Sequence, residues 1–500
     1  MLFNSYVFLL AFLPLVVLVY APLRAHRSWA IWFLVVASGF FYVYWNPAYL
    51  PLLIGSVGVN YAILWAQNQL PQHRGLLLVG LVFNGATLFY FKYAGFILGE
   101  INAWFQVAWE LPQSKVLPLA ISFYTFQQAG VLIDNFYLGR RQISLRNYTF
   151  FVVFFPQLIA GPIVRYDDVD SQFEPKVPWA QWCEGFWKGL FLFTLGLAKK
   201  VLLADQLWPY AAALFDQTSS YGNLSFIEAW VGTLAYTFQL YFDFSGYSDM
   251  AVGLGLMFGF NLPMNFNSPF LAPNIADFWK RWHISLSRWF MAYLYTPMYL
   301  SWGKKYFPKF SPYLLSFFTM ALVGVWHGAG YTYVFCGLLH GSYLVLYQFT
   351  KGWKPWQNLW KRVPAQVICG RLITFVAVIH AMVLFRVHNL NQAVDVIKAL
   401  WLGNGVGIPY AQFFKYSSWI KAWSWPDYDW IIPRHAFWWL LACGVLIFLC
   451  PNSGEWTGLQ KKKKRLAWSY QWSHALGSAL LLVFCLYFLN QESEFLYFQF

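Results

Sequence analysis

Charged side chains are scarce in this sequence. Only 11% of its 500 residues are Asp, Glu, Lys or Arg, whereas 59% are hydrophobic. Soluble domains typically carry about 25% charged residues, because their surfaces face water. The composition therefore excludes a string of ordinary soluble domains and indicates a chain whose main solvent is lipid.

Familiar signatures of soluble enzymes are also absent. The sequence contains no GxSxG elbow, no Walker A loop, no HExxH pair and no Rossmann glycine fingerprint, so hydrolase, kinase and zinc-protease functions have no support. Its cysteines form no CxxC pair and no metal-type spacing, and we predict no metal site, disulfide framework or acyl-carrying thiol. They are Cys183, Cys336, Cys369, Cys443, Cys450 and Cys485.

Positive charge is present, with a formal net charge of +14, but it does not point to nucleic acid. Lys and Arg form short clusters between apolar segments rather than one basic face, as expected for residues that flank membrane spans. The positive-inside rule predicts that these clusters are cytoplasmic. They lie at residues 24–27, 140–146, 304–309, 351–362 and 461–465.

Apolar runs near the length needed to cross hydrocarbon recur along the whole chain. A helix needs about 20 residues for this, and several runs are shorter or too polar, so we expect eleven to fourteen crossings with some re-entrant half-helices and interfacial helices. The fold class is thus an all-α polytopic membrane protein, with residues 1–500 as one domain. Candidate spans lie near 3–22, 30–45, 48–66, 76–98, 116–136, 149–164, 187–204, 224–242, 247–262, 289–302, 312–330, 331–349, 370–386, 436–450 and 473–490.

Two histidines stand within the apolar stretch 311–341. Polar residues at membrane depth are costly, which makes His327 and His340 functional candidates, although each could be a buried imidazole bonded to a nearby carbonyl. Thirteen residues on a continuous helix give a rise of about 20 Å and a rotation near 220°. The two rings would then lie on different faces and levels, unless the neighbouring glycines break the helix.

The segment 265–288, NFNSPFLAPNIADFWKRWHISLSR, is too polar to span the membrane and too aromatic for a free loop. Asn274 followed by Asp277 predicts a helix N-cap, and the helix that follows would place Trp279, His283 and Leu286 on one side. Nearby cations could bind an anionic group or lipid headgroups. These cations are Lys280, Arg281 and Arg288.

Two carboxylates, Asp243 and Asp249, interrupt the apolar segment 241–249. They need basic partners or helix N-termini at that depth. The sequence alone leaves a structural ion pair and a role at the active site equally open.

Six blocks of this chain resemble the membrane-bound O-acyltransferases. Within that family the chain is most similar to the branch that holds the alginate O-acetyltransferase membrane subunit and the D-alanyl transfer protein of teichoic acid synthesis. The blocks are PLAISFYTFQ (118–127), FFPQLIAGPIVRYDD (154–168), YFDFSGYSDMAVGLG (241–255), NFNSPFLAPNIADFWKRWHISLSRW (265–289), GVWHGAGYTYVFCGLLHG (324–341) and LFRV (384–387).

The resemblance implies a ring of helices around a central tunnel, and it implies catalytic roles for two histidines. His327 lies in the WHG block and His283 in the WKRWH block. We expect His327 to act as general base on the acceptor hydroxyl, and His283 to orient a substrate or stabilise the oxyanion. Binding of the donor is expected at Trp279, Lys280, Arg281 and Arg288, with support from Asn274, Asp277, Trp326, His340 and Asp243.

The same resemblance implies substrates, partners and location. No cofactor is expected to stay bound; acetyl-CoA or another cytosolic acyl thioester would be the donor. A periplasmic acetyltransferase-type partner would pass the acetyl group to an exopolysaccharide such as alginate, at the bacterial inner membrane. Alternatives are acetylation of cellulose or another surface polymer, a transporter or flippase, and a noncatalytic scaffold. Transporters also show intramembrane His and Asp, but this chain has no visible inverted repeat.

Overall fold

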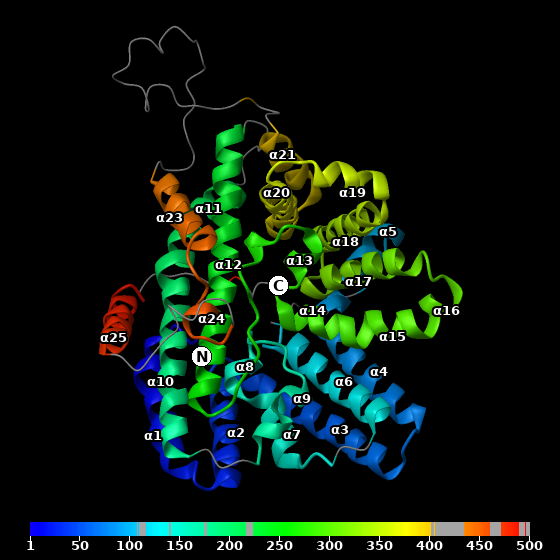
Figure 1. The fold of residues 1–500 in the computed structure, drawn as a ribbon. Coiled ribbons are helices and arrows are strands. Elements are labelled where there is room, and N and C mark those ends of the chain that lie inside the picture. The colour runs from blue at the N-terminus through cyan, green and yellow to red at the C-terminus, as the bar shows by residue number, and fades with distance from the viewer. Residues whose placement is uncertain are drawn as a thin grey trace.

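A computed structural model gives the structure of the protein, and it describes residues 1–107, 109, 117–139, 142–174, 178–216, 224–401, 405, 435–460, 472–489 and 496. Every element within these ranges is a helix, which confirms the all-α prediction (Figure 1). Arg140, Arg141 and the basic cluster 461–465 lie outside the described residues.

The N-terminal third, up to Gln172, is helical in its described residues. Short π-helical and 3-10 segments (η) continue or join the α-helices. The elements are η1 (Val7–Phe12), α1 (Leu13–Leu23), α2 (Arg27–Val43), η2 (Pro47–Tyr49), α3 (Leu50–Gln69), α4 (Arg74–Leu88), η3 (Phe89–Tyr93), α5 (Ala94–Phe105), α6 (Ile121–Leu138), α7 (Leu145–Val153), α8 (Phe155–Leu158), α9 (Tyr166–Val169) and η4 (Asp170–Gln172).

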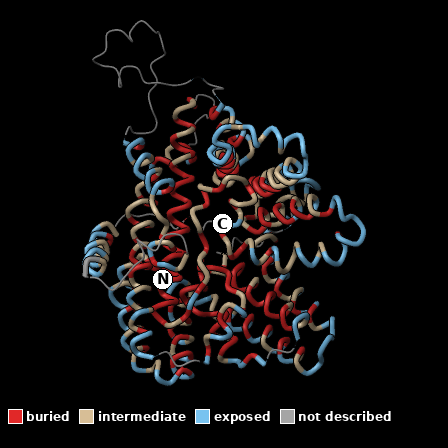
Figure 2. The backbone as a smooth tube through the Cα atoms, viewed as in Figure 1, coloured by how far each residue is buried: buried red, intermediate tan, exposed pale blue. Residues whose placement is uncertain are grey.

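The central pillar is α12 (Phe226–Met257), which is 32 residues long and buried along most of its length (Figure 2). It packs against α10 (Trp179–Ala198), η5 (Lys199–Ala204) and α11 (Asp205–Phe215). A capping box begins it: the Ser225 hydroxyl accepts from Glu228 N, and the Glu228 carboxylate accepts from Ser225 N. The prediction of two spans at 224–242 and 247–262 is therefore wrong. One helix runs through both, because its internal carboxylates find basic partners.

The remaining elements build the region around the two glycine-flanked histidines. A continuous helical run, α14 to α16, precedes the hairpin of α17 and α18. The elements are η7 (Pro269–Leu271), α13 (Ile275–Trp279), α14 (Ile284–Phe290), η8 (Met291–Tyr295), α15 (Thr296–Met298), η9 (Tyr299–Gly303), α16 (Lys304–Tyr306), α17 (Ser311–His327), α18 (Tyr331–Gly352), α19 (Lys354–Lys361), α20 (Gln366–Arg386), α21 (Leu390–Leu400), α23 (Ala436–Phe448), α24 (Ser453–Trp456) and α25 (Trp472–Tyr487).

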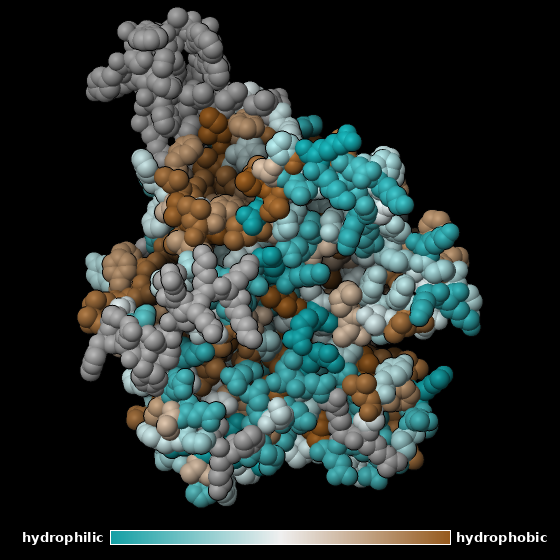
Figure 3. Space-filling model, in the orientation of Figure 1, coloured by the Kyte–Doolittle hydropathy of each residue, from teal (hydrophilic) through white to brown (hydrophobic). Residues whose placement is uncertain are grey.

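Three of the described helical segments are long and apolar enough to cross a membrane: Pro47–Gln69, Arg74–Phe105 and Gln366–Arg386. Shorter apolar helices lie at Val7–Leu23, Arg27–Val43, Ala436–Phe448 and His474–Tyr487. Apolar side chains are prominent on the outer surface over α23 and α25 (Figure 3). The expected number of eleven to fourteen crossings is not tested by these lengths and stays a prediction.

Candidate active site

The stretch 311–341 folds as a helical hairpin instead of one continuous helix. α17 ends at His327, Gly328 and Gly330 have extended backbones, and α18 begins at Tyr331. The two helices touch through glycine: a Cβ at Gly324 would lie 2.9 Å from the Cα of Gly337. The glycines therefore break the helix, which was the condition under which both histidines could serve one site.

The hairpin changes the relation between His327 and His340. Gly324 faces Gly337, and each histidine lies three residues beyond its glycine in helices that run in opposite directions. A rise of 1.5 Å per residue then separates the two levels by about 9 Å rather than about 20 Å. Both side chains line one cavity, so the expectation for a continuous helix is wrong.

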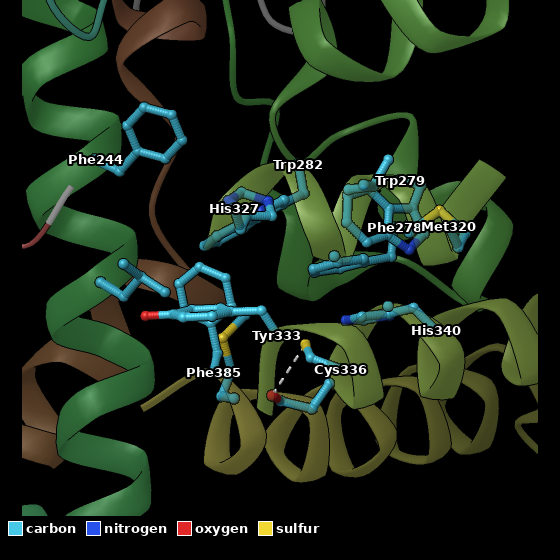
Figure 4. Close-up of a pocket in the computed structure, with 16 residues that line it drawn as sticks. Phe244, Phe278, Trp279, Trp282, Met320, His327, Tyr333, Cys336, His340 and Phe385 are labelled. Carbon is cyan, nitrogen blue, oxygen red and sulfur yellow. Dashed lines mark hydrogen bonds between the residues drawn. The ribbon is translucent and has the colours of Figure 1, made fainter. Parts of the chain in front are cut away.

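This cavity is small, about 40 Å³, and lies among α12, α13, α17, α18 and α20 (Figure 4). His327 and His340 face it from opposite sides, and its walls are mainly aromatic and apolar. The lining includes Leu240, Phe244, Phe278, Trp279, Trp282, Met320, Val323, Gly324, His327, Tyr333, Cys336, Gly337, His340, Met382 and Phe385.

His327 is the more accessible of the site histidines, since it is only partly buried while His283 and His340 are 1% and 5% exposed. It is the last residue of α17, and its ring packs edge-on against Phe385 with centroids 5.0 Å apart. The Trp326 ring also packs edge-on against it, with centroids 4.9 Å apart. The imidazole thus stands at a helix end with aromatic supports and an open side toward the cavity.

Two buried polar atoms belong to the cavity wall and have no protein partner in the part of the chain that the structure describes. They are Nδ1 of His340 and Nε1 of Trp279. The two rings contact each other edge-on, with centroids 4.9 Å apart. Buried polar atoms are normally hydrogen-bonded, so an unpaired set beside a cavity points to a bound group that completes them.

The predicted helix through Trp279, His283 and Leu286 is broken. Asn274 is the N-cap as expected, and its side chain accepts from Asp277 N at 2.9 Å. However, α13 ends at Trp279, and His283 has a left-handed backbone with φ of 45° before α14 begins. A sequence without glycine or proline at this point gives no sign of such a break. The break directs Trp279 into the cavity and His283 away from its lining.

His283 lies behind the cavity wall. Its Nδ1 is 3.3 Å from Oδ1 of Asn265, an oxygen that also accepts from the backbone N and hydroxyl of Ser285. The ring packs on Phe244 and faces Trp326, at centroid distances of 4.8 and 6.1 Å. His283 is not found among the described residues that line this cavity, and its expected role in orienting a substrate or stabilising the oxyanion stays a prediction.

The cations near α13 do not gather into one site. Arg281 pairs with Asp277 at 2.7 Å, and Arg288 pairs with Asp168 at 3.1 Å. Lys280 is exposed. Asp277 is thereby a partner of Arg281 as well as part of the capped turn. Binding of a donor phosphate at these three residues stays a prediction.

The two aspartates of α12, Asp243 and Asp249, belong to buried ion pairs. Asp243 lies 2.7 Å from Nζ of Lys200, which also contacts Asp205 at 2.8 Å. Asp249 pairs with Lys199 at 2.6 Å. The sequence left open a structural ion pair or a role at the active site. The structure places both carboxylates in ion pairs between α12 and η5. A carboxylate at this depth is stable only with such a partner.

One residue beside the site was missed from the sequence. Lys92 interrupts the apolar helix Arg74–Phe105, and its ammonium donates to the backbone oxygens of Trp326 at 2.5 Å and His327 at 3.0 Å. The signal was present, because a lone lysine inside a candidate span is by default a functional candidate.

Comparison with known proteins agrees with this architecture. The model of the membrane-bound O-acyltransferase family matches residues 59–391. The chain belongs to this family and is a membrane-embedded O-acyltransferase, which confirms the resemblance seen in its six sequence blocks and supports neither the transporter nor the scaffold alternative.

Particular relatives are similar over most of the chain. A peptidoglycan O-acetyltransferase of Helicobacter pylori is 39% identical, covering 82% of this chain and 81% of the relative. A probable alginate O-acetylase AlgI of Pseudomonas aeruginosa is 38% identical, covering 80% and 75%. A teichoic acid D-alanyltransferase of Bacillus subtilis is 29% identical, covering 53% and 68%.

Proposed function

We propose that this protein transfers acetyl groups from a cytosolic thioester, with acetyl-CoA as the leading donor, for O-acetylation of an extracytoplasmic polysaccharide. The observation that carries the chemistry is the cavity in which the accessible His327 faces two unpaired buried polar atoms. Relatives named for alginate and for peptidoglycan support a polysaccharide as the final acceptor. Alginate or a similar exopolysaccharide is our first choice, and peptidoglycan is the second.

In the proposed reaction, a neutral nitrogen of His327 takes the proton of the acceptor hydroxyl. The hydroxyl oxygen then forms a bond to the thioester carbonyl carbon, and the negative charge passes to the carbonyl oxygen. When that intermediate collapses, the carbon–sulfur bond breaks and the imidazolium returns its proton to the departing thiolate. General-base assistance of this kind contributes about 10²–10⁴-fold.

The unpaired atoms across the cavity have a matching role. Nε1 of Trp279 is a hydrogen-bond donor, and Nδ1 of His340 is a donor in one neutral tautomer. Either could bond to the carbonyl oxygen as its charge develops, which is the largest single contribution in many acyl transfers. His283 would act from behind the wall, by holding the Trp326 ring that supports His327.

The route of the acetyl group is part of the proposal. We infer that the protein lies in the inner membrane of a bacterium and passes the acetyl group to a periplasmic acetyltransferase-type partner, which completes transfer to sugar hydroxyls. The relatives named for peptidoglycan and alginate support a polymer as the final acceptor of the acetyl group.

The central experiment measures radiolabel transfer from acetyl-CoA by the purified protein in detergent or nanodiscs. It is run with alginate oligomers or peptidoglycan fragments, each with and without the periplasmic partner. Label in a polymer with the wild type, and a rate at least about 10²-fold lower with His327→Ala, is the expected result. Absence of label with every acceptor, from protein that is folded by thermal melting, would contradict the proposal.

His340→Ala is expected to lower kcat per folded molecule by about 10-fold or more, since one oxyanion-type donor contributes on the order of 10²–10³-fold. Trp279→Phe, which removes only the ring N–H, should act in the same direction. The matched control is Trp289→Phe, because the Trp289 N–H donates to Phe126 O and its ring is not among the described lining residues. If His340→Ala and Trp279→Phe have the same kcat as the control Trp289→Phe, then neither His340 nor Trp279 stabilises the oxyanion.

Lys280→Gln is expected to raise the KM for acetyl-CoA a few-fold with kcat nearly unchanged, because an exposed lysine that binds a donor phosphate contributes equally to the ground and transition states. Arg281→Gln and Arg288→Gln should have smaller effects, since both guanidinium groups are engaged by carboxylates. Acetyl-CoA titrations at two salt concentrations measure this. An unchanged KM in all three variants would assign these residues to headgroup contact.

A further inference from the structure

The helical segment from Arg74 to Phe105 passes behind the break between α17 and α18 and contacts both of its sides. It is built from α4, η3 and α5, and its side chains reach the last turn of α17 and the first residue of α18. We propose that Lys92 is a positioning residue that holds the catalytic imidazole of His327 by binding the end of its helix. This inference rests on the proposed role of His327.

The contacts at the α17 end are specific. Nζ of Lys92 donates to Trp326 O at 2.5 Å and to His327 O at 3.0 Å, and the Tyr93 hydroxyl donates to Val325 O at 3.0 Å. Three consecutive backbone carbonyls that end α17 are thereby bonded by two neighbouring side chains. The Lys92 ammonium also lies 5.6 Å from the centre of the Trp326 ring, within the range of a cation–π contact.

These carbonyls need such partners. The last four carbonyls of any α-helix lack intrahelical donors, and Gly328 leaves the helix in an extended conformation. In an apolar region water cannot supply the missing hydrogen bonds, so side chains must do so. A cation is also the favoured charge at a helix C-terminus, where the helix dipole is negative. Lys92 thus fixes the one turn of α17 that carries the imidazole.

The other side of the break is held by the same segment. The Glu100 carboxylate accepts from the Tyr331 hydroxyl at 2.8 Å, and the rings of Phe96 and Tyr331 meet edge-on with centroids 5.5 Å apart. Tyr331 is the first residue of α18, which carries His340 into the cavity. One helical segment therefore contacts both of the helices that contribute the facing histidines.

Lys92 acts through His327 and not on the substrate. It is absent from the described residues that line the cavity, and its ammonium is directed to the backbone oxygens of Trp326 and His327. Loss of this cation would leave the imidazole present but its helix end free to shift. A misplacement near 1 Å can lower a rate by about 10²-fold without changing substrate affinity.

The test compares Lys92→Met with Lys92→Arg in the purified full-length protein, with initial rates of labelled acetyl transfer normalised to folded protein. We expect Lys92→Met to lower kcat by about 10- to 100-fold with the KM for acetyl-CoA within about 2-fold of wild type. Lys92→Arg retains the charge and the donors and should recover most of the loss. Lys309→Met, which removes an exposed lysine, is the matched control and should leave kcat unchanged.

A merely structural role is distinguished by a double variant. If Lys92 acts through His327, then Lys92→Met in the His327→Ala background should cause no further fall in the residual rate, because groups that act as a unit are not additive. A further 10-fold fall would overturn the proposal. Activity of the single His327→Ala variant reports separately on the proposed function, so the two failures cannot be confused.

If Lys92→Met fails to fold, a second variant, Tyr93→Phe, still tests the proposal. Tyr93→Phe removes only the hydroxyl that bonds Val325 O and is measured in the same way. We expect it to lower kcat by about 2- to 5-fold at constant KM, and to lose that effect in the His327→Ala background. An unchanged kcat for Tyr93→Phe, or a fall of the same size in the His327→Ala background, would contradict positioning by this segment.

Discussion

Replacing His327 with alanine is expected to reduce acetyl transfer by at least about 10²-fold, to a low residual rate that the radiolabel assay still measures. The imidazole is the accessible base of the cavity, and general-base assistance contributes about 10²–10⁴-fold to rates of this type. Membrane level and melting temperature should change little, because the side chain is only partly buried and stands at a helix end. Radiolabel transfer and thermal melting of the same preparation measure both quantities.

His380→Ala provides the matched control for this experiment. His380 is also a partly buried histidine on an apolar helix, and its ring nitrogens contact Val376 O at 2.7 Å and the Trp401 N–H at 2.9 Å. It is not among the described residues that line the cavity. We expect wild-type activity per folded molecule from His380→Ala. Comparable losses in both histidine variants would show that the effect arises from helix packing, and the assignment of His327 would fall.

The second large effect is expected from Gly337→Val, which should abolish most folded protein and the activity of the remainder. A Cβ at Gly337 would lie 2.4 Å from the backbone oxygen of Met320, and one at Gly324 would lie 2.3 Å from the oxygen of Tyr333. Backbone atoms cannot rotate away, so α17 and α18 must separate. Overpacking of this kind typically destabilises by about 1–3 kcal/mol, and the separation would also displace His327 from His340.

Gly324→Ala and Gly85→Ala test the same explanation with the smallest change. Both glycines are helical, but a Cβ at Gly85 meets nothing within 4 Å. Alanine favours helix over glycine by about 1 kcal/mol, so Gly85→Ala should be neutral or stabilising, whereas Gly324→Ala should lower the melting temperature. Fluorescence-detected size-exclusion after heating compares them. Equal melting temperatures for the two variants would exclude close helix contact as the basis of the hairpin.

Several features of the site could be predicted because they depend only on residues close together in the sequence. The side-chain oxygen of Asn274 can accept from the backbone N–H of Asp277, three residues later, so an N-cap was expected there. The structure confirms it. The family follows from six blocks of sequence, and the matching family model confirms it. His327 was recognised by its block and lies in the cavity, although its catalytic role stays a prediction.

Other features depend on contacts between distant residues. The sequence around the break before His283 contains no glycine or proline that would predict it. Instead, Asn265 Oδ1 accepts from Ser285 N and Oγ, and Asn265 O accepts from Ile284 N, so a segment eighteen or more residues away holds the turn. A helix prediction from local sequence does not include that distant partner. The predicted helix therefore continued past Trp279, with Trp279 and His283 on the same side.

The sequence by itself determined that this chain is helical, is embedded in a membrane and belongs to the O-acyltransferase family. Composition and short motifs are sufficient for this, because they act through local hydrogen bonds and burial. Only the tertiary structure decided which polar groups meet. The approach of Gly324 to Gly337 brings His340 to the cavity of His327, and a helix more than two hundred residues earlier supplies Lys92 to the same turn. Such meetings depend on how helices pack, and packing is set by surfaces far apart in the chain.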